Sequence, residues 1–257
     1  MLQASHLNYK HKNHQILKDL DFSCNSGQFV SILGPNGAGK STLLSLLANE
    51  YREKGVKIFF KSKEYETWCT NELPKHKAKF SQHNNSDIPL KVCDVVMMGR
   101  YPYFENNPSE KDQKAIQECM QCTDVCPLQD REYNQLSGGE KQRVHLARVL
   151  AQLENTLDEK IIFLDEPLNN LDVLHQHKIL KLLKDFSKRG NSVIVVLHDL
   201  NLAAQFSDKI LLMKDGEKVG YDTPNNILTQ EIISTVYNFP CTVSMNPINN
   251  NPLIIFG

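Results

Sequence analysis

A glycine-rich loop that can hold phosphates is the strongest chemical signal in the sequence. Residues 34–41 fit G-x-x-x-x-G-K-[ST] and read Gly34, Pro35, Asn36, Gly37, Ala38, Gly39, Lys40 and Ser41, with Thr42 directly after them. In such a loop the glycines turn backbone N–H groups inward around a phosphate chain. Lys40 would reach the β- and γ-phosphates, and Ser41 would hold Mg²⁺. The loop therefore predicts that a nucleotide and a magnesium ion bind here.

The elements on either side of the loop match what the motif needs. Residues 28–33 form a short apolar run typical of a strand, and residues 41–47 show an apolar helical pattern. A helix that begins at the loop adds partial positive charge from its unpaired N–H groups. The order strand, glycine loop, helix makes a chance match much less probable.

Two carboxylates follow a second apolar strand. Residues 161–164 are entirely apolar, as in a parallel sheet covered on both faces, and Asp165 and Glu166 come directly after them. Ligands of α/β proteins bind at this end of the strands. Asp165 fits an Mg²⁺ partner, and Glu166 fits a general base acting on water. His198 ends the next buried strand, 193–197, and is expected at the same edge.

A third motif begins a helix. Residues 136–140 read Leu136, Ser137, Gly138, Gly139 and Glu140. Ser137 and Glu140 have the spacing of a capping box, and the two glycines leave the first N–H groups open to an anion. By itself the pattern is equally compatible with a simple helix cap.

Composition limits the function classes. The chain has 257 residues, a hydrophobic content of 40% and a formal net charge of −1, without the basic excess of nucleic-acid-binding domains. No apolar run approaches about 18 residues, and residues 1–13 have no signal-peptide core. The 7 cysteines, an odd number, indicate free thiols in a reducing compartment. Cys119, Cys122 and Cys126 have ligand-like spacing, but a buried helical face is the favoured interpretation.

Together these motifs resemble the ABC-type ATPases, the nucleotide-binding subunits of transporters. The resemblance extends over about residues 2–229, with residues 136–140 as the signature motif and residues 161–166 as Walker B. Further single matches are Gln82 as the Q-loop glutamine, Leu171 and Asp172 as the D-loop, His198 as the switch histidine and Tyr9 as the aromatic that stacks on adenine. One departure is Leu168, Asn169 and Asn170, where Thr-Ser-Ala or similar is common; it leaves the D-loop aspartate in place.

The resemblance implies roles for these residues. Catalysis would rest on Lys40, Gln82, Glu166 and His198, and Mg²⁺ would be held by Ser41, Gln82 and Asp165. ATP would contact Tyr9 and residues 34–42 of one chain, and Ser137, Gly138, Gly139, Glu140 and Asp172 of a second copy. The cofactors implied are ATP and Mg²⁺.

The implied architecture is α/β, a P-loop ABC ATPase core with an antiparallel β lobe and a helical lobe. One domain spans residues 1–257: residues 1–83 and 158–226 form the core and β lobe, residues 84–157 the helical lobe, and residues 227–257 a tail. In that tail we expect a short helix, an Asn- and Pro-rich stretch and an apolar end. The implied partners are a second copy, a membrane permease that docks near the helical lobe and, indirectly, a periplasmic or surface substrate-binding protein. The chain would lie peripherally at the cytoplasmic face of the inner membrane.

Within the family the chain resembles importer subunits for iron siderophores, haem and vitamin B12. Residues 95–102, 143–153 and 171–177 carry that likeness, and the last two stretches are nearest to haem members. Haem import is therefore the favoured function, with siderophore or vitamin B12 import as alternatives. A soluble ABC ATPase of iron–sulfur cluster assembly is an alternative from another class. DNA-repair and translation ATPases are disfavoured, because the long heptad insert and the second cassette are both missing.

Overall fold

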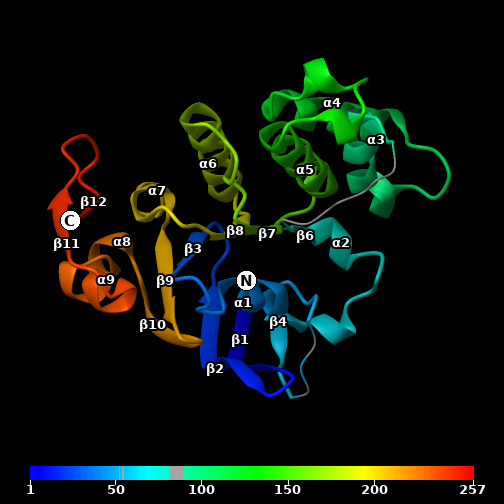
Figure 1. The fold of residues 1–257 in the computed structure, drawn as a ribbon. Helices are drawn as coiled ribbons and strands as arrows, with labels where there is room; N and C mark the ends of the chain where they lie inside the picture. Colours follow the sequence, from blue (N-terminus) through cyan, green and yellow to red (C-terminus); the bar gives the residue numbers. More distant parts are fainter. Residues whose placement is uncertain (52, 54, 82–88) are drawn as a thin grey trace.

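The computed structural model describes residues 1–51, 53, 55–81 and 89–257, and a six-stranded sheet forms its centre (Figure 1). In spatial order its strands are β10 (Glu217–Asp222), β9 (Lys209–Lys214), β3 (Phe29–Leu33), β8 (Ser192–Val196), β7 (Ile161–Asp165) and β6 (Lys77–Phe80). The strands from β9 to β6 run parallel, and β10 is antiparallel to β9. The carboxyl ends of the parallel strands therefore share one edge.

The two faces of this sheet pack against different elements. In β3, Phe29 and Leu33 belong to one hydrophobic cluster, whereas Val30 and Ile32 belong to another. This division follows from the alternation of side chains along a strand. The first cluster includes side chains from α5 (Gly138–Leu153), α6 (Val173–Lys188) and α7 (Leu200–Phe206), and the second includes α1 (Lys40–Leu47). Because both faces are covered, these strands read as continuous apolar runs.

An antiparallel lobe completes the second cluster. Its four-stranded sheet has the order β2 (His14–Cys24), β1 (Leu2–His11), β4 (Ile58–Phe60) and β5 (Lys63–Glu64), followed in the chain by a 3₁₀ turn (Tyr65–Thr67) and α2 (Leu73–His76). The sequence predicted the first two strands over residues 2–9 and 16–24. In the structure both extend to the tip of their hairpin, where His11 pairs with His14.

A helical segment lies at one end of the molecule, coloured green in Figure 1. It contains α3 (Val92–Met97), a 3₁₀ segment (Met98–Tyr103), α4 (Glu110–Cys122), two 3₁₀ turns (Cys126–Leu128 and Tyr133–Gln135) and α5. Arg100 is buried at its centre. Its guanidinium donates to Asp112 Oδ1 at 2.9 Å, to Ala151 O at 2.7 Å and to Glu154 O at 2.6 Å. One side chain thus joins the 3₁₀ segment, α4 and the end of α5.

The prediction that three cysteines share a helical face is wrong. α4 ends at Cys122, and Cys126 begins the next 3₁₀ turn. Thr123 and Asp124 break the helix between them, and Asp124 has a φ of 56°. Only Cys119 of the three is buried. Thiol spacing alone does not report where a helix stops.

The C-terminal tail lies at the opposite end of the molecule from the helical segment (Figure 1). It follows α8 (Pro224–Ile227) and contains α9 (Gln230–Tyr237) and a hairpin of β11 (Cys241–Met245) and β12 (Pro252–Phe256). The sequence predicted a short helix and an Asn- and Pro-rich stretch with an apolar end, so the hairpin was missed. Its strands are short, and the Asn-rich connection hid the pairing. No helix among the described residues has the length and apolar character needed to cross a membrane.

Candidate active site

The glycine loop leads from β3 into α1, as its sequence predicted. Gly37 and Gly39 have φ angles of 82° and 91°, which side-chain-bearing residues rarely adopt. A Cβ at Gly39 would also lie 2.9 Å from Leu17 Cδ2 of β2. Both the backbone and the packing therefore require glycine here. The loop packs directly against β2, so the antiparallel lobe forms part of the site.

Lys40 spans the loop from the inside. Its Nζ donates to Gly34 O at 2.8 Å and to Pro35 O at 3.0 Å, and the residue is only 6% exposed. Burial lowers the pKa of Lys40, and the carboxylates of Glu166 and Asp165 oppose that effect. The ammonium group is thus held inside the loop by carbonyl oxygens. A bound phosphate chain would replace these oxygens as its partners.

Ser41 and Asp165 meet across the sheet edge. Ser41 Oγ donates to Asp165 Oδ1 at 2.9 Å, although the two residues are far apart in the chain. Burial raises the pKa of Asp165, and the Ser41 hydrogen bond counteracts this. Hydroxyl and carboxylate oxygens are the donors that Mg²⁺ prefers, and this ion usually takes only one or two protein ligands besides water and phosphate. The pair therefore fits Mg²⁺. Gln82, the third predicted ligand, lies outside the described residues.

Glu166 is engaged through both carboxylate oxygens. His198 Nε2 lies 2.7 Å from Oε1, and Asn169 Nδ2 donates to Oε2 at 2.8 Å. Burial disfavours ionisation of Glu166, but the hydrogen bonds from Asn169 and His198 outweigh it and hold the pKa below its usual range. The carboxylate is therefore ionised at neutral pH, as a general base must be. Sequence reasoning found Glu166 and His198 but treated Asn169 only as a departure from the family pattern.

A cavity of about 410 Å³ lies over the loop. Its lining is His14, Ile16, Asn36, Gly37, Gly39, Lys40, Ser41, Thr42 and Glu166. Sequence reasoning missed His14 and Ile16, which β2 brings in. Tyr9 is not part of this lining: it pairs with Leu17 across the hairpin, and its ring stacks on Tyr51 with centroids 5.5 Å apart. Stacking of Tyr9 on adenine stays a prediction.

The predicted helix start at Ser137 forms a second, separate cavity of about 370 Å³. Glu140 N donates to Ser137 Oγ at 3.3 Å, and Ser137 N donates to Glu140 Oε2 at 2.8 Å, so the predicted capping box is confirmed. This cavity is lined by Ser137, Gly138, Gly139, Glu140, Arg143, Asn170, Leu171, Asp172 and His175. No residue of the glycine loop appears in it. Asp172 caps α6 and accepts from the backbone and ring nitrogens of His175.

One contact links the two cavities. Gln142, on the helix that begins at Ser137, donates through Nε2 to the backbone oxygen of Glu166 at 3.1 Å. A Cβ at Gly139 would lie 2.7 Å from Asn170 O, which requires glycine for this close approach. The segment from Glu166 to Asn170 thus touches α5 on one side and the glycine-loop cavity on the other.

Comparison with known proteins decides the family. The sequence profile described as ABC transporter matches residues 17–169, from β2 through the carboxylate pair. The chain belongs to the ABC transporter family. Its glycine loop, carboxylate pair and Ser137 helix are therefore the P-loop, Walker B and signature motifs of an ABC-type ATPase, and the predicted fold and enzyme class are confirmed.

Curated relatives of this ABC cassette extend over its full length. A hemin import ATP-binding protein, HmuV, of Vibrio vulnificus strain YJ016 is 41% identical over 99% of this chain and 97% of its own. The protein of the same name from Escherichia coli O157:H7 is 37% identical over 99% of both chains. The name hemin import ATP-binding protein is that of the two relatives, to which this chain is similar.

Solved structures agree on the fold. A metal-chelate type ABC transporter in an inward-facing conformation matches with a TM-score of 0.82 and 26% identity, covering 100% of this chain and 96% of the other. A dimeric ATP-binding cassette in a post-hydrolysis state, bound to ADP and phosphate, matches with a TM-score of 0.75 and 30% identity. It covers 87% of this chain and 98% of the other. The ABC cassette of this chain therefore binds ATP, and such cassettes work as dimers beside permease components.

Proposed function

We propose that this chain is the ATP-hydrolysing subunit of a haem importer. The observation that carries the proposal is the full-length similarity to proteins named for hemin import, at 37–41% identity. The match to a metal-chelate type transporter supports an importer of metal complexes. The chain itself does not need to touch haem, because cargo would pass through a separate permease.

Two copies would complete two sites. In one chain the P-loop cavity and the signature cavity have no lining residue in common. The signature cavity offers a capped helix start but no lysine of the P-loop type. Placing the signature of one copy against the P-loop of the other would supply donors from both sides to one ATP. The dimeric cassette with bound ADP and phosphate supports this arrangement.

Within each composite site the described residues have separate tasks. Lys40 neutralises charge on the β- and γ-phosphates, and Ser137 with the neighbouring amides of the partner copy binds the γ-phosphate. Glu166 takes a proton from water as it attacks the γ-phosphorus, the bond to the β-phosphate breaks, and ADP and phosphate form. His198 orients Glu166 and the γ-phosphate. Mg²⁺, when bound by Ser41 and Asp165, would neutralise the developing charge.

The permease would dock near the helical lobe, so the chain would sit peripherally at the cytoplasmic face of the inner membrane. The exposed ring of Tyr101, 59% accessible, lies in the 3₁₀ segment that begins at Met98 and supports this placement. Arg100 beneath it fixes that segment to α4 and α5. A large exposed aromatic on a rigid base is a common anchor of protein interfaces.

Growth on defined iron sources tests the cargo. Deleting the gene should abolish growth with haem as sole iron source and leave ferric-siderophore use intact, and the wild-type gene should restore growth. A matched strain carrying Glu166→Gln should fail in the same way, because the protein is made but cannot turn over. Loss of siderophore or vitamin B12 uptake with normal haem use would overturn the cargo assignment. A defect confined to iron–sulfur enzymes would favour the cluster-assembly alternative instead.

A further inference from the structure

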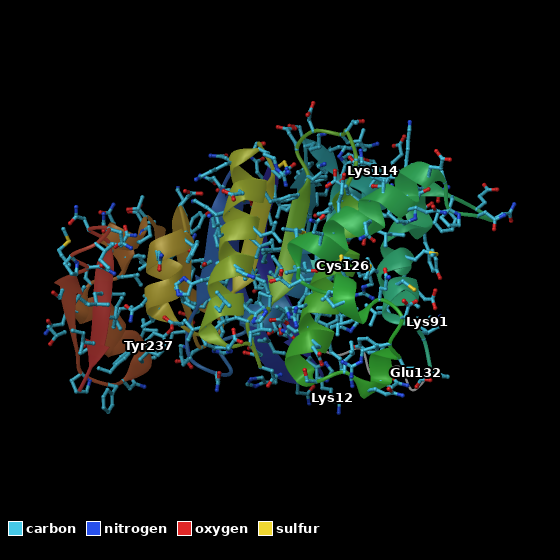
Figure 2. The ribbon with its side chains drawn as sticks, turned by 90° about the horizontal axis from the view of Figure 1, so that it is seen from above. Lys12, Lys91, Lys114, Cys126, Glu132 and Tyr237 are labelled. Atoms are coloured by element: carbon cyan, nitrogen blue, oxygen red, sulfur yellow. The ribbon has the colours of Figure 1, made fainter. Side chains whose placement is uncertain are left out.

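The C-terminal tail contacts the surroundings of the ATPase site at two points, and its residues there belong to none of the sequence motifs. We define the tail unit as residues 230–256, which comprise α9 and the β11–β12 hairpin. It packs beside the carboxyl end of β9 and the first turn of α7, and Tyr237, labelled in Figure 2, packs against the core of the molecule. The sequence alone indicates no function for this segment.

The first contact is with the P-loop. The hydroxyl oxygen of Tyr237 faces the backbone N–H of Gly34, and burial raises the pKa of that hydroxyl to about 12. The carbonyl of the same Gly34 accepts from Lys40 Nζ at 2.8 Å. A single residue thus joins Tyr237 on one side to the phosphate-binding lysine on the other. Removing the Tyr237 hydroxyl would leave the buried N–H of Gly34 facing no polar atom of that side chain.

Gly34 cannot move away from these partners freely. A Cβ built there would lie 2.2 Å from Met213 O of β9, so the loop begins in direct contact with that strand. The next residue, Lys214, donates to Thr235 O at 2.7 Å and to Asn238 Oδ1 at 2.9 Å, at the end of α9. The end of β9 is therefore fixed to both the P-loop and the tail unit.

The second contact is with the helix that follows His198. Asn201 donates through Nδ2 to Ile254 O at 3.1 Å and accepts from Ile254 N at 2.8 Å, so its amide pairs with one backbone residue of β12 in both directions. Asn201 lies in the first turn of α7, and Asp199 caps that helix. The position of α7 determines the position of His198, because only Asp199 lies between His198 and the first residue of the helix.

One strand joins both contacts. The ring of Phe256 packs edge-on against Tyr237, with centroids 6.1 Å apart, two residues beyond Ile254. We propose that the tail unit positions the ATPase site by fixing the P-loop and His198 relative to each other, with Tyr237 and Asn201 as its two positioning residues. The inference rests on the role assigned to His198 in the proposed function.

The two positioning residues should have different kinetic signatures. Tyr237 acts through Gly34 and Lys40, which bind phosphates in the ground state as well as in the transition state. Tyr237→Phe should therefore raise KM for ATP about threefold to tenfold with little change in kcat. Asn201 acts through His198, whose contact matters most during hydrolysis. Asn201→Ala should lower kcat by a similar factor with KM for ATP nearly unchanged.

Matched controls separate positioning from general stability. Tyr221→Phe also removes one tyrosine hydrogen bond, 2.6 Å long, which joins β10 to Ser23 O of β2. Asn191→Ala also removes two backbone hydrogen bonds, to Lys160 N and Phe186 O, at the amino ends of the strands. ATPase kinetics and thermal unfolding of the full chain should be measured for all four. Both controls should keep wild-type kcat and KM even where they lower the unfolding temperature.

A double-mutant cycle gives the decisive result. Combining Asn201→Ala with His198→Ala should give the kcat of His198→Ala alone, since Asn201 acts through that ring. Kinetic losses in the tail variants no larger than in the controls, or additive losses in the cycle, would overturn the positioning role. If His198→Ala itself turns over normally, the site assignment fails rather than the tail proposal.

Discussion

The two halves of the ATP site differ in how far a single chain has assembled them. In the P-loop half the reacting groups already have partners within the chain. Glu166 contacts His198 and Asn169, and Lys40 donates to carbonyl oxygens of the loop. In the signature half Ser137 and Glu140 bond to each other at an exposed helix start, and Glu140 also pairs with Arg131 at 3.6 Å. The reacting groups are thus preorganised within one chain, whereas in the proposed dimer a partner copy would supply the second set of donors.

Removing the charge of Glu166, the proposed base, should have the largest effect on ATP turnover. Glu166→Gln should reduce ATP turnover about 10²- to 10⁴-fold, because an amide cannot take the proton of the attacking water. ATP binding should persist through Lys40, so an ATP-bound dimer should accumulate. Turnover measured by phosphate release, and mass measured by light scattering with ATP, check both statements. Undiminished turnover would remove Glu166 from the role of base.

Mixing defects tests whether the halves belong to different copies. Lys40→Ala and Ser137→Arg variants should each be nearly inactive as homodimers. In a mixed dimer one composite site carries both defects and the other carries neither, so turnover should return to at most half that of the wild type. Titrating one variant against the other while recording ATPase activity checks this. If mixing restores no activity, the composite site is contradicted.

Asn169 offers a finer test of the P-loop half. Its amide helps to hold the pKa of Glu166 below the usual range, so Asn169→Ala should raise that pKa. The base must be ionised to act, and the acidic limb of the pH–rate profile should therefore move to higher pH. Above neutrality kcat should change little, because His198 and Lys40 still favour the ionised carboxylate.

The control for Asn169 is Asn226→Ala, which removes a comparable amide–carboxylate bond, 3.0 Å long to Asp222, away from the site. It should leave the acidic limb in place. An unmoved limb in Asn169→Ala would mean that this amide does not influence the base.

The smallest expected effect distinguishes a cap from a ligand. Ser137 and Ser109 both cap helices in complete capping boxes, so alanine at either position should cost about 1 kcal/mol of unfolding free energy. Only Ser137→Ala should also slow ATP turnover, because only that hydroxyl lines the signature cavity. Chemical denaturation and ATPase assays of both variants provide the comparison. Equal turnover in the two variants would reduce Ser137 to a structural cap.

Much of the site was predictable because its motifs are local. The P-loop, the capping box at Ser137 and the strand before Asp165 each depend on residues close in the chain, where turn and helix chemistry act. The hairpin at the C-terminus was not predictable in the same way, since its strands are short and contact α7 and α9. The cysteine face failed for a related reason, because Asp124 ends the helix pattern early.

The sequence by itself determined the chemical groups and the strand edge at which they gather. Glycine spacing, apolar runs and caps are set by backbone conformation over a few residues, and these identified Lys40, Ser41, Asp165, Glu166 and His198. Only the tertiary structure decided which partners those groups take: Asn169 on Glu166, His14 and Ile16 beside the P-loop, and Tyr237 on Gly34. Such contacts join segments distant in the chain, and their geometry follows from packing the whole domain rather than from any local pattern.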